Sequence, residues 1–251
     1  MGEQSYGKAG AAVFSSAVWD LWRSRFALGE VLYRDEALMV TINPQLREDS
    51  RVMVLTARDG HAIVVMTPAI ADKIGLLQKQ AVSQPKLRQG LKDAGIRLHG
   101  ADYLFYFPEA DKAALRQETY PEVRRLTVDD TVAFAEFQAA ASAGDLDAAY
   151  VELDHWAAFG IFDHGRLVSV ASMYPWESPL VADLGVLTLP PYRGHGHARR
   201  LVRASSRFAC GHGFEPQYRC QTDNQASARL AYSAGLQLFG TWEVVSPDSP
   251  V

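Results

Sequence analysis

The chain has 251 residues, of which 48% are hydrophobic and 22% charged, and its formal net charge is −4 with a pI near 6.0. This is the composition of a globular protein with enough apolar material for about two domains. The acidic balance excludes a general attraction to nucleic acid or to an anionic membrane. An anionic ligand would therefore need a local binding site.

Cysteine usage and the N-terminal sequence indicate the compartment. Cys210 and Cys220 are the only cysteines, which predicts a reducing environment rather than a disulfide framework. The start of the chain lacks the basic and apolar regions of a signal peptide, and no segment has the ~20 apolar residues needed to span a bilayer. Neither Asn43 nor Asn224 lies in a glycosylation sequon. We expect a cytoplasmic protein.

The first 118 residues show helix and strand patterns but no chemical motif. Apolar residues repeat at helical spacing near the start, and Asp59-Gly60 between two apolar runs indicates a β-hairpin. A polar stretch at 109–120 precedes Pro121, and we predict a domain boundary there. A smaller α+β domain over 1–118 is expected. Its predicted elements are a helix at 11–28, strands at 51–57 and 61–66, a short helix opening at Pro68, a helix at 85–94 and a strand at 102–107.

Residues 119–251 have a denser succession of elements and are predicted to form a second domain. Thr127 followed by Asp130 is the pattern of a helix N-cap, and the polar residues 163–166 separate two apolar runs as in a hairpin. The predicted elements are strands at 123–126, 157–162, 167–174, 181–189, 215–222 and 236–245, and helices at 127–144, 196–210 and 224–234.

The most informative segment is 190–198, of sequence PPYRGHGHA, which joins a predicted strand to an amphipathic helix through Gly194 and Gly196. Glycines let backbone N–H groups converge, and the start of a helix adds the positive end of its dipole. This arrangement is typical of a cradle for phosphate oxygens. The alternative is a tight strand-to-helix turn without a ligand.

Two other glycine-loop classes are excluded by spacing. No Gly-x-x-x-x-Gly-Lys-Ser/Thr run exists, so the loop is not a P-loop. A dinucleotide-binding fingerprint would need a third glycine where Arg199 stands, and an arginine prevents the close packing of helix on strand that this glycine permits.

Arg193-x-x-Gly196-x-Ala198 resembles the (Gln/Arg)-x-x-Gly-x-(Gly/Ala) signature of the GNAT acetyltransferase superfamily. Residues 224–227 and Gly235-Leu236 are similar to later parts of that family's sequence, and the order of predicted elements from 123 to 245 resembles its core. The resemblance implies an α+β fold with a mixed, mostly antiparallel sheet flanked by helices. The first 118 residues would be an additional N-terminal domain.

The resemblance also implies acetyl-CoA as the cosubstrate, with no metal. The strand before the signature would splay from its neighbour, and a backbone N–H there would polarise the thioester carbonyl. Gly185 in this strand suits a bulge or a close backbone approach. Asn224 would contact the cosubstrate or cap its helix. The remaining implied cofactor-binding residues are Val186, Leu187 and Thr188 for the pantetheine amides, and Arg193, Gly194, His195, Gly196, His197 and Ala198 for the pyrophosphate.

Amine acetylation needs a neutral nucleophile, although an alkyl amine has a pKa of about 10, so a base must take a proton. By resemblance the base is a carboxylate on the strand before the signature, which makes Asp183 the candidate, with Glu177 as a substitute. The alternative for Asp183 is an ordinary hydrogen-bonded aspartate. Family members commonly protonate the leaving thiolate with a tyrosine, but that position holds Ala231. Tyr232, the candidate acid, is about 100° further round the helix.

We therefore expect direct transfer of an acetyl group from acetyl-CoA to a primary amine of an unidentified acceptor. A small molecule is favoured over a protein as acceptor, and neither nucleic acid nor membrane is an expected partner. The alternatives are a non-catalytic acyl-CoA-binding regulatory module, transfer of a different acyl group, or a hydroxyl acceptor. The aromatic strand at 102–107 leaves a homodimer open, and the four arginines at 199–207 form a solvated face or reach the coenzyme's 3′-phosphate.

Overall fold

The computed structural model describes residues 13–78, 82–178 and 180–249, so residues 11 and 12 of the first predicted helix lie outside the described residues. The chain forms two compact units, each assembled from separate segments. Unit 1 holds residues up to Val18, Phe105–Arg219 and Gln225–Gln237. Unit 2 holds Trp19–Leu104, Cys220–Asn224 and Leu238–Val251.

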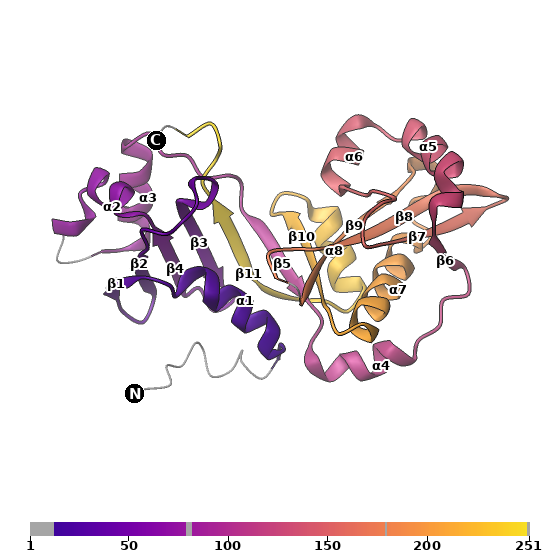
Figure 1. Ribbon diagram of the computed structural model, residues 1–251, viewed down its shortest axis with the longest axis horizontal. Coiled ribbons are helices and arrows are strands. Elements are labelled where there is room, and N and C mark those ends of the chain that lie inside the picture. The colour runs from indigo at the N-terminus through magenta and orange to yellow at the C-terminus, as the bar shows by residue number, and fades with distance from the viewer. Residues whose placement is uncertain (1–12, 79–81, 179, 250–251) are drawn as a thin grey trace. The chain divides into compact units, whose positions relative to one another are not determined.

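The secondary structure follows the predicted order closely (Figure 1). The strands are β1 (Glu30–Arg34), β2 (Leu38–Ile42), β3 (Val52–Ala57), β4 (Ala62–Met66), β5 (Asp102–Tyr106), β6 (Val123–Leu126), β7 (Ala157–Asp163), β8 (Arg166–Pro175), β9 (Val181–Thr188), β10 (Glu215–Gln221) and β11 (Gln237–Val244). The α-helices are α1 (Ser16–Phe26), α2 (Pro68–Lys73), α3 (Gln84–Asp93), α4 (Lys112–Gln117), α5 (Thr131–Ala140), α6 (Ala143–Ala149), α7 (His197–Gly211) and α8 (Gln225–Ser233).

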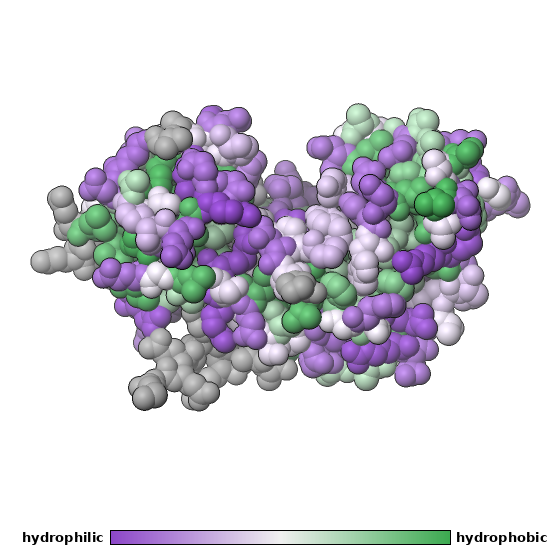
Figure 2. Space-filling model, viewed as in Figure 1, coloured by the Kyte–Doolittle hydropathy of each residue, from purple (hydrophilic) through white to green (hydrophobic). Residues whose placement is uncertain are grey.

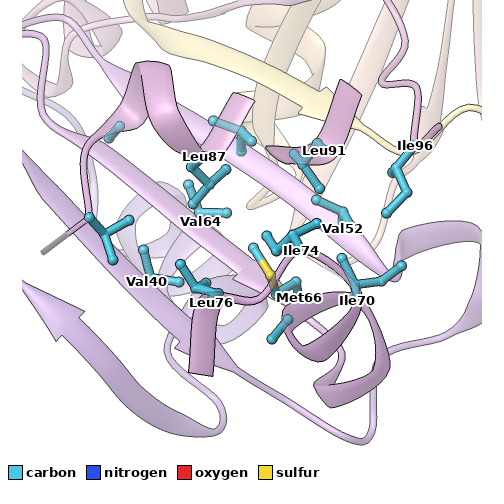
Figure 3. Close-up of a cluster of buried hydrophobic side chains, with 14 of the residues drawn as sticks. Val40, Val52, Val64, Met66, Ile70, Ile74, Leu76, Leu87, Leu91 and Ile96 are labelled. Carbon is cyan, nitrogen blue, oxygen red and sulfur yellow. The ribbon is translucent and has the colours of Figure 1, made fainter. Parts of the chain in front are cut away.

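Unit 2 is built on strands in the order β1-β2-β4-β3-β11. The predicted hairpin is confirmed: β3 and β4 pair antiparallel, and Gly60 takes the positive φ of 88° that the turn requires. Pro68 opens α2, as predicted. Side chains of α2 and α3, among them Ile70, Leu87 and Leu91, pack on the apolar strands β2, β3 and β4 (Figure 3). Burial of this cluster is what holds the two helices to the sheet.

Unit 1 contains residues 190–198, here called the glycine loop. Strands β6, β7, β8 and β9 pair antiparallel in chain order, and β10 adds to β9 in parallel. The β7–β8 hairpin turns at His164 and Gly165, whose φ values of 46° and 83° match a turn that needs two left-handed residues. The predicted fold class, an α+β protein with a mixed and mostly antiparallel sheet, is confirmed.

Helices cover both faces of the sheet in unit 1 (Figure 1). On one face, Phe134 and Phe137 of α5 pack with Val170 and Leu187 of the sheet. On the other face, Leu201 of α7 packs in a separate cluster of sheet side chains. The alternation of side chains along a strand produces these two faces. Neighbouring residues of β9 therefore point to opposite layers.

Three features differ from the sequence-based prediction. The helix predicted over 127–144 is broken, because Ala141 is extended and Ser142 caps a second helix by accepting a hydrogen bond from the Asp145 N–H. The polar stretch at 109–120 contains α4, in which Lys112 is buried and its Nζ lies 2.6 Å from a Glu215 oxygen. Strands β1 and β2 were not predicted. The Thr127–Asp130 capping box is present as predicted.

Among the described residues, no helix is both long enough and apolar enough to cross a membrane. Figure 2 shows hydrophobic areas scattered between hydrophilic ones on the face that it presents. Scattered apolar residues of this kind are normal on protein surfaces.

Candidate functional site

The glycine loop forms a cradle of backbone N–H groups. A short 3-10 turn at Pro190–Tyr192 follows β9, and Gly194 and Gly196 have φ values of 83° and 78°. Gly196 is the N-cap of α7. Within the described part of the chain, the backbone N–H groups of residues 194–199 have no hydrogen-bond acceptor. Unpartnered N–H groups at the positive end of a helix are suited to phosphate oxygens.

The side chains of two arginines, Arg193 and Arg200, bind to the protein around this loop. The Arg193 guanidinium donates to the Thr188 carbonyl at 3.0 Å and lies 3.1 Å from an Asp145 carboxylate oxygen of α6. Arg200 donates to the carbonyl of His195 at 3.1 Å. Since both side chains are engaged with the protein, the cradle itself is made by the backbone. Burial, followed by the positive charge of Arg200, lowers the pKa of His197.

Strands β9 and β10 separate part of the way along, which creates a gap in the sheet. Their parallel pairing runs from Glu215–Val181 to Tyr218–Leu184 and stops there. Strand β9 continues to Thr188 and stays paired with β8 over its whole length. The predicted splay of this strand from its neighbour is therefore present.

The hydrogen-bonding alternation of the antiparallel pair decides which backbone groups face the gap. Leu189 N–H bonds the Val168 carbonyl and Trp176 N–H bonds the Val181 carbonyl, so the odd-numbered residues of β9 bond with β8. The backbone groups of Val186 and Thr188 are directed away from β8, toward the gap, while those of Leu187 face β8. The geometry therefore favours Val186 and Thr188 over Leu187 for pairing with an amide-bearing ligand.

A glycine is needed at position 185 because α6 comes close to the strand there, and not because the strand has a bulge. The register of β9 against β8 runs without a shift through the Ser172–Gly185 pair. A Cβ at Gly185 would overlap the carbonyl oxygen of Ala149, the last residue of α6. Only glycine lets the end of α6 lie this close to the strand.

Asp183 lies on β9 beside the gap, as predicted, but its carboxylate is fully engaged. Arg219 donates to it through Nε and through Nη2, the latter at 2.6 Å, and Gln217 donates to it at 2.9 Å. Tyr174 donates from the phenol at 3.0 Å. Burial, and then the charge of Asp183, raises the pKa of Tyr174, so the phenol stays protonated. A carboxylate that already accepts these bonds is poorly placed to take a proton from a substrate.

Helix α8 contains Ala231 and Tyr232, the two positions considered for the acid that protonates the leaving thiolate. Ala231 is buried and Tyr232 is 55% exposed, in agreement with side chains that point in different directions. The ring of Tyr232 packs edge-on against Phe105. Glu177, the substitute base, is exposed in the loop after β8, and residue 179 of that loop lies outside the described residues. Asn224 belongs to unit 2, and its contact with the cosubstrate stays a prediction.

A cluster of aromatic side chains and a histidine, which the sequence pattern did not reveal, lies on the same sheet face as Asp183. The rings of Tyr150, His155 and Tyr174 contact one another, with centroid distances of 4.8–5.3 Å. Tyr150 ends α6 in a left-handed conformation with φ 46°, which costs a bulky residue of the order of 1 kcal/mol. His155 Nδ1 lies 2.8 Å from Ser172 Oγ. Only the strand register, which sequence spacing does not reveal, places Ser172 opposite Gly185.

The two sides of the site differ in charge. Residues 126–165, which include α5, α6 and the segment that carries His155, contain eight Asp and Glu residues and no Lys or Arg. Helix α7 and its loop contain Arg193, Arg199, Arg200, Arg203 and Arg207. Among the described residues, no group of three His, Cys, Asp or Glu side chains could hold a metal ion. The side of the site formed by α7 and its loop is thus basic, and the side formed by residues 126–165 is acidic.

Comparison with known proteins shows which family this part of the chain resembles. Residues 120–236 match the acetyltransferase (GNAT) family. An acetyltransferase of the GNAT family from Colwellia psychrerythraea shares the fold with a TM-score of 0.51 at 16% identity, over 77% of this chain and 80% of that one. No curated protein matches the chain.

Two further solved structures are similar at lower TM-scores. A putative GNAT-family acetyltransferase from Novosphingobium aromaticivorans matches with a TM-score of 0.46 at 21% identity, over 60% of this chain and 66% of that one. An aminoglycoside N-acetyltransferase in complex with CoA matches with a TM-score of 0.37 at 20% identity, over 46% of this chain and 90% of that one. Residues 120–236, which include the glycine loop and the splayed strand β9, are therefore similar to the GNAT acetyltransferase family.

Proposed function

We propose that the protein transfers an acetyl group from acetyl-CoA to a primary amine by direct attack of the amine on the thioester. The observation that carries this proposal is the gap after Leu184, next to a cradle of unpartnered N–H groups at residues 194–199. The cradle suits the pyrophosphate of the coenzyme. Val186 and Thr188 offer backbone groups to the pantetheine arm, and a backbone N–H in the gap suits the oxyanion that forms during transfer.

The acceptor that fits best is a small cationic amine. The Lys- and Arg-free segment 126–165 makes the side of the sheet with α5 and α6 acidic, which attracts an ammonium group. Aromatic rings at Tyr150 and Tyr174 add faces to which a cation binds.

A second candidate function is a non-catalytic acyl-CoA-binding module. It is favoured by buried Ala231 at the position where the family commonly has its acid tyrosine. A thiolate leaves without an acid more readily than an alkoxide would, so catalysis without this tyrosine is chemically reasonable. Release of free thiol from acetyl-CoA, measured against a panel of mono- and polyamines, distinguishes the two functions.

The location of the coenzyme site is tested by a charge placed in the cradle. Gly194→Asp puts a carboxylate among the N–H groups. We expect coenzyme A affinity to fall at least about tenfold, because the carboxylate repels the negatively charged pyrophosphate at this short distance. Gly165→Asp is the matched control: both glycines have φ 83° and neither has an atom within 4 Å of an added Cβ. Isothermal titration calorimetry with coenzyme A gives both affinities. Equal affinities in the two folded variants would place the coenzyme elsewhere.

A further inference from the structure

His155 stands where a base for the acceptor amine is needed. It belongs to the segment between α6 and β7 and is half-buried. Its Nδ1 lies 2.8 Å from Oγ of the buried Ser172, which is the strand partner of Gly185. Gly185 precedes Val186, whose backbone groups face the gap. The imidazole is thus hydrogen-bonded to the β8 residue that pairs with Gly185, next to the strand position where the reaction is proposed to occur.

The surroundings of the ring suit a proton acceptor. Ser172 Oγ accepts the Glu152 N–H at 3.1 Å and has a second lone pair for Nδ1–H of His155. With Nδ1 protonated, Nε2 holds the lone pair that takes a proton, and the imidazolium that results keeps its bond to Ser172. Burial lowers the pKa of His155, and the negative charges of Asp154 and Glu152 oppose this effect only in part. The net result is a pKa below the ordinary value of histidine. The ring is therefore neutral at pH 7.

Two other titratable groups on this face, Tyr174 and Asp183, are engaged with each other and with Arg219. The phenol of Tyr174, which packs against His155 with a centroid distance of 4.8 Å, donates to Asp183. The Asp183 carboxylate in turn pairs with Arg219. Tyr150 presents its ring from the end of α6. His155 lies outside the hydrogen-bond network of Asp183, so the lone pair on its Nε2 is able to accept a proton.

We propose that His155 is the general base of the transfer and that Ser172 positions it; this rests on the proposed acetyltransferase function. As the amine nitrogen forms its bond to the thioester carbon, its proton passes to Nε2 of His155. The C–S bond then breaks and the coenzyme leaves as the thiolate, which takes up a proton from the imidazolium or from water. The acceptor is a cationic amine, which loses one proton to solvent before it attacks.

The test uses the full-length protein and four variants. His155→Asn keeps an amide group where Nδ1 bonds Ser172 but has nothing in place of Nε2. We expect it to lower kcat/KM about 10²–10⁴-fold at pH 7, with coenzyme A affinity unchanged, and the loss to shrink toward pH 10, where hydroxide takes the proton in place of the imidazole. His164→Asn, at the exposed left-handed turn of the β7–β8 hairpin, is the matched control and should match the wild type. His155→Ala should regain activity on addition of imidazole, and Asp183→Asn should keep the wild-type shape of the pH profile.

Each result decides between the proposals. Full activity of folded His155→Asn on amines that the wild type acetylates overturns the assignment of the base and leaves the proposed function intact. A His155→Asn variant whose residual activity keeps the wild-type shape of the pH profile, together with no imidazole rescue in His155→Ala, shows a structural role, which also overturns it. A wild type that binds coenzyme A but releases no thiol with any amine overturns the proposed function, and the base assignment with it.

Discussion

At the Asp183 carboxylate, four donor groups from Arg219, Gln217 and Tyr174 converge on two oxygens. Asp183→Asn removes the charge that balances Arg219 and exchanges an acceptor oxygen for an amide donor. We expect the free energy of unfolding to fall by about 1–3 kcal/mol, the range for hydrogen bonds to charged groups. Asp147→Asn, at an exposed position of α6, is the control. Thermal denaturation gives the difference, and equal stabilities would mean that the Asp183 network contributes little.

The two cysteines provide a second prediction. Cys210 is buried and Cys220 is only partly buried, and burial raises the pKa of the Cys210 thiol to about 11. At pH 8 only about one molecule in a thousand then carries the reactive thiolate at this position. Iodoacetamide should therefore label Cys220 well before Cys210 in the folded protein. Mass spectrometry of the labelled peptides checks the order, and rapid labelling of Cys210 would show that its helix opens readily.

Residues of the site differed in how well sequence could locate them. The glycine loop was predictable because its geometry depends on adjacent residues: two left-handed positions and a helix start. The partners of Asp183 and the position of His155 were not, because both depend on strand register and on the turn at Tyr150. The sequence shows a carboxylate on the strand before the signature but not the Arg219 guanidinium that pairs with it.

Helix α6 and strand β9 lie so close at Gly185 that a methyl group does not fit. Gly185→Ala should therefore lower the free energy of unfolding by at least about 2 kcal/mol, because backbone has to move to relieve the overlap. Gly144→Ala, in α6 with free space around it, should be neutral or stabilising by up to about 1 kcal/mol. Chemical denaturation of the two variants measures both changes. A stable Gly185→Ala variant would show that α6 adjusts its position easily.

Whole elements were predicted where local signals agree. Asp59-Gly60, residues 163–166 and the Thr127 capping box each determine a turn or a helix start through neighbouring residues, and all three are present. Strands β1 and β2 were missed because β1 is largely exposed and lacks an apolar alternation, and because no Asn-Gly or Asp-Gly turn separates it from β2. Helix α4 was missed because its buried Lys112 is charged, and its burial depends on the distant Glu215 as well as on the neighbouring Glu109.

For the molecule as a whole, the predicted division between residues 118 and 119 can be tested by limited proteolysis. Helix α4 packs Leu115 and Lys112 within unit 1, and protected backbone is cut slowly. We expect residues 112–117 to resist trypsin in the folded protein, although Lys112 and Arg116 are potential cleavage sites. Early cleavage there, identified by mass spectrometry, would instead support a flexible boundary between two domains.

The separation of β9 from β10 leaves an edge strand in the interior of a sheet. Edge strands expose unpaired amides, and proteins usually shield them because they recruit other strands. Here the exposed amides are those of Val186 and Thr188, and an extended ligand with its own amides completes the sheet in the way an added strand would. Amide hydrogen exchange at Val186 should therefore be fast in the free protein and slow with coenzyme A bound. The sheet would thus reach its full protection only when a ligand serves as its missing strand.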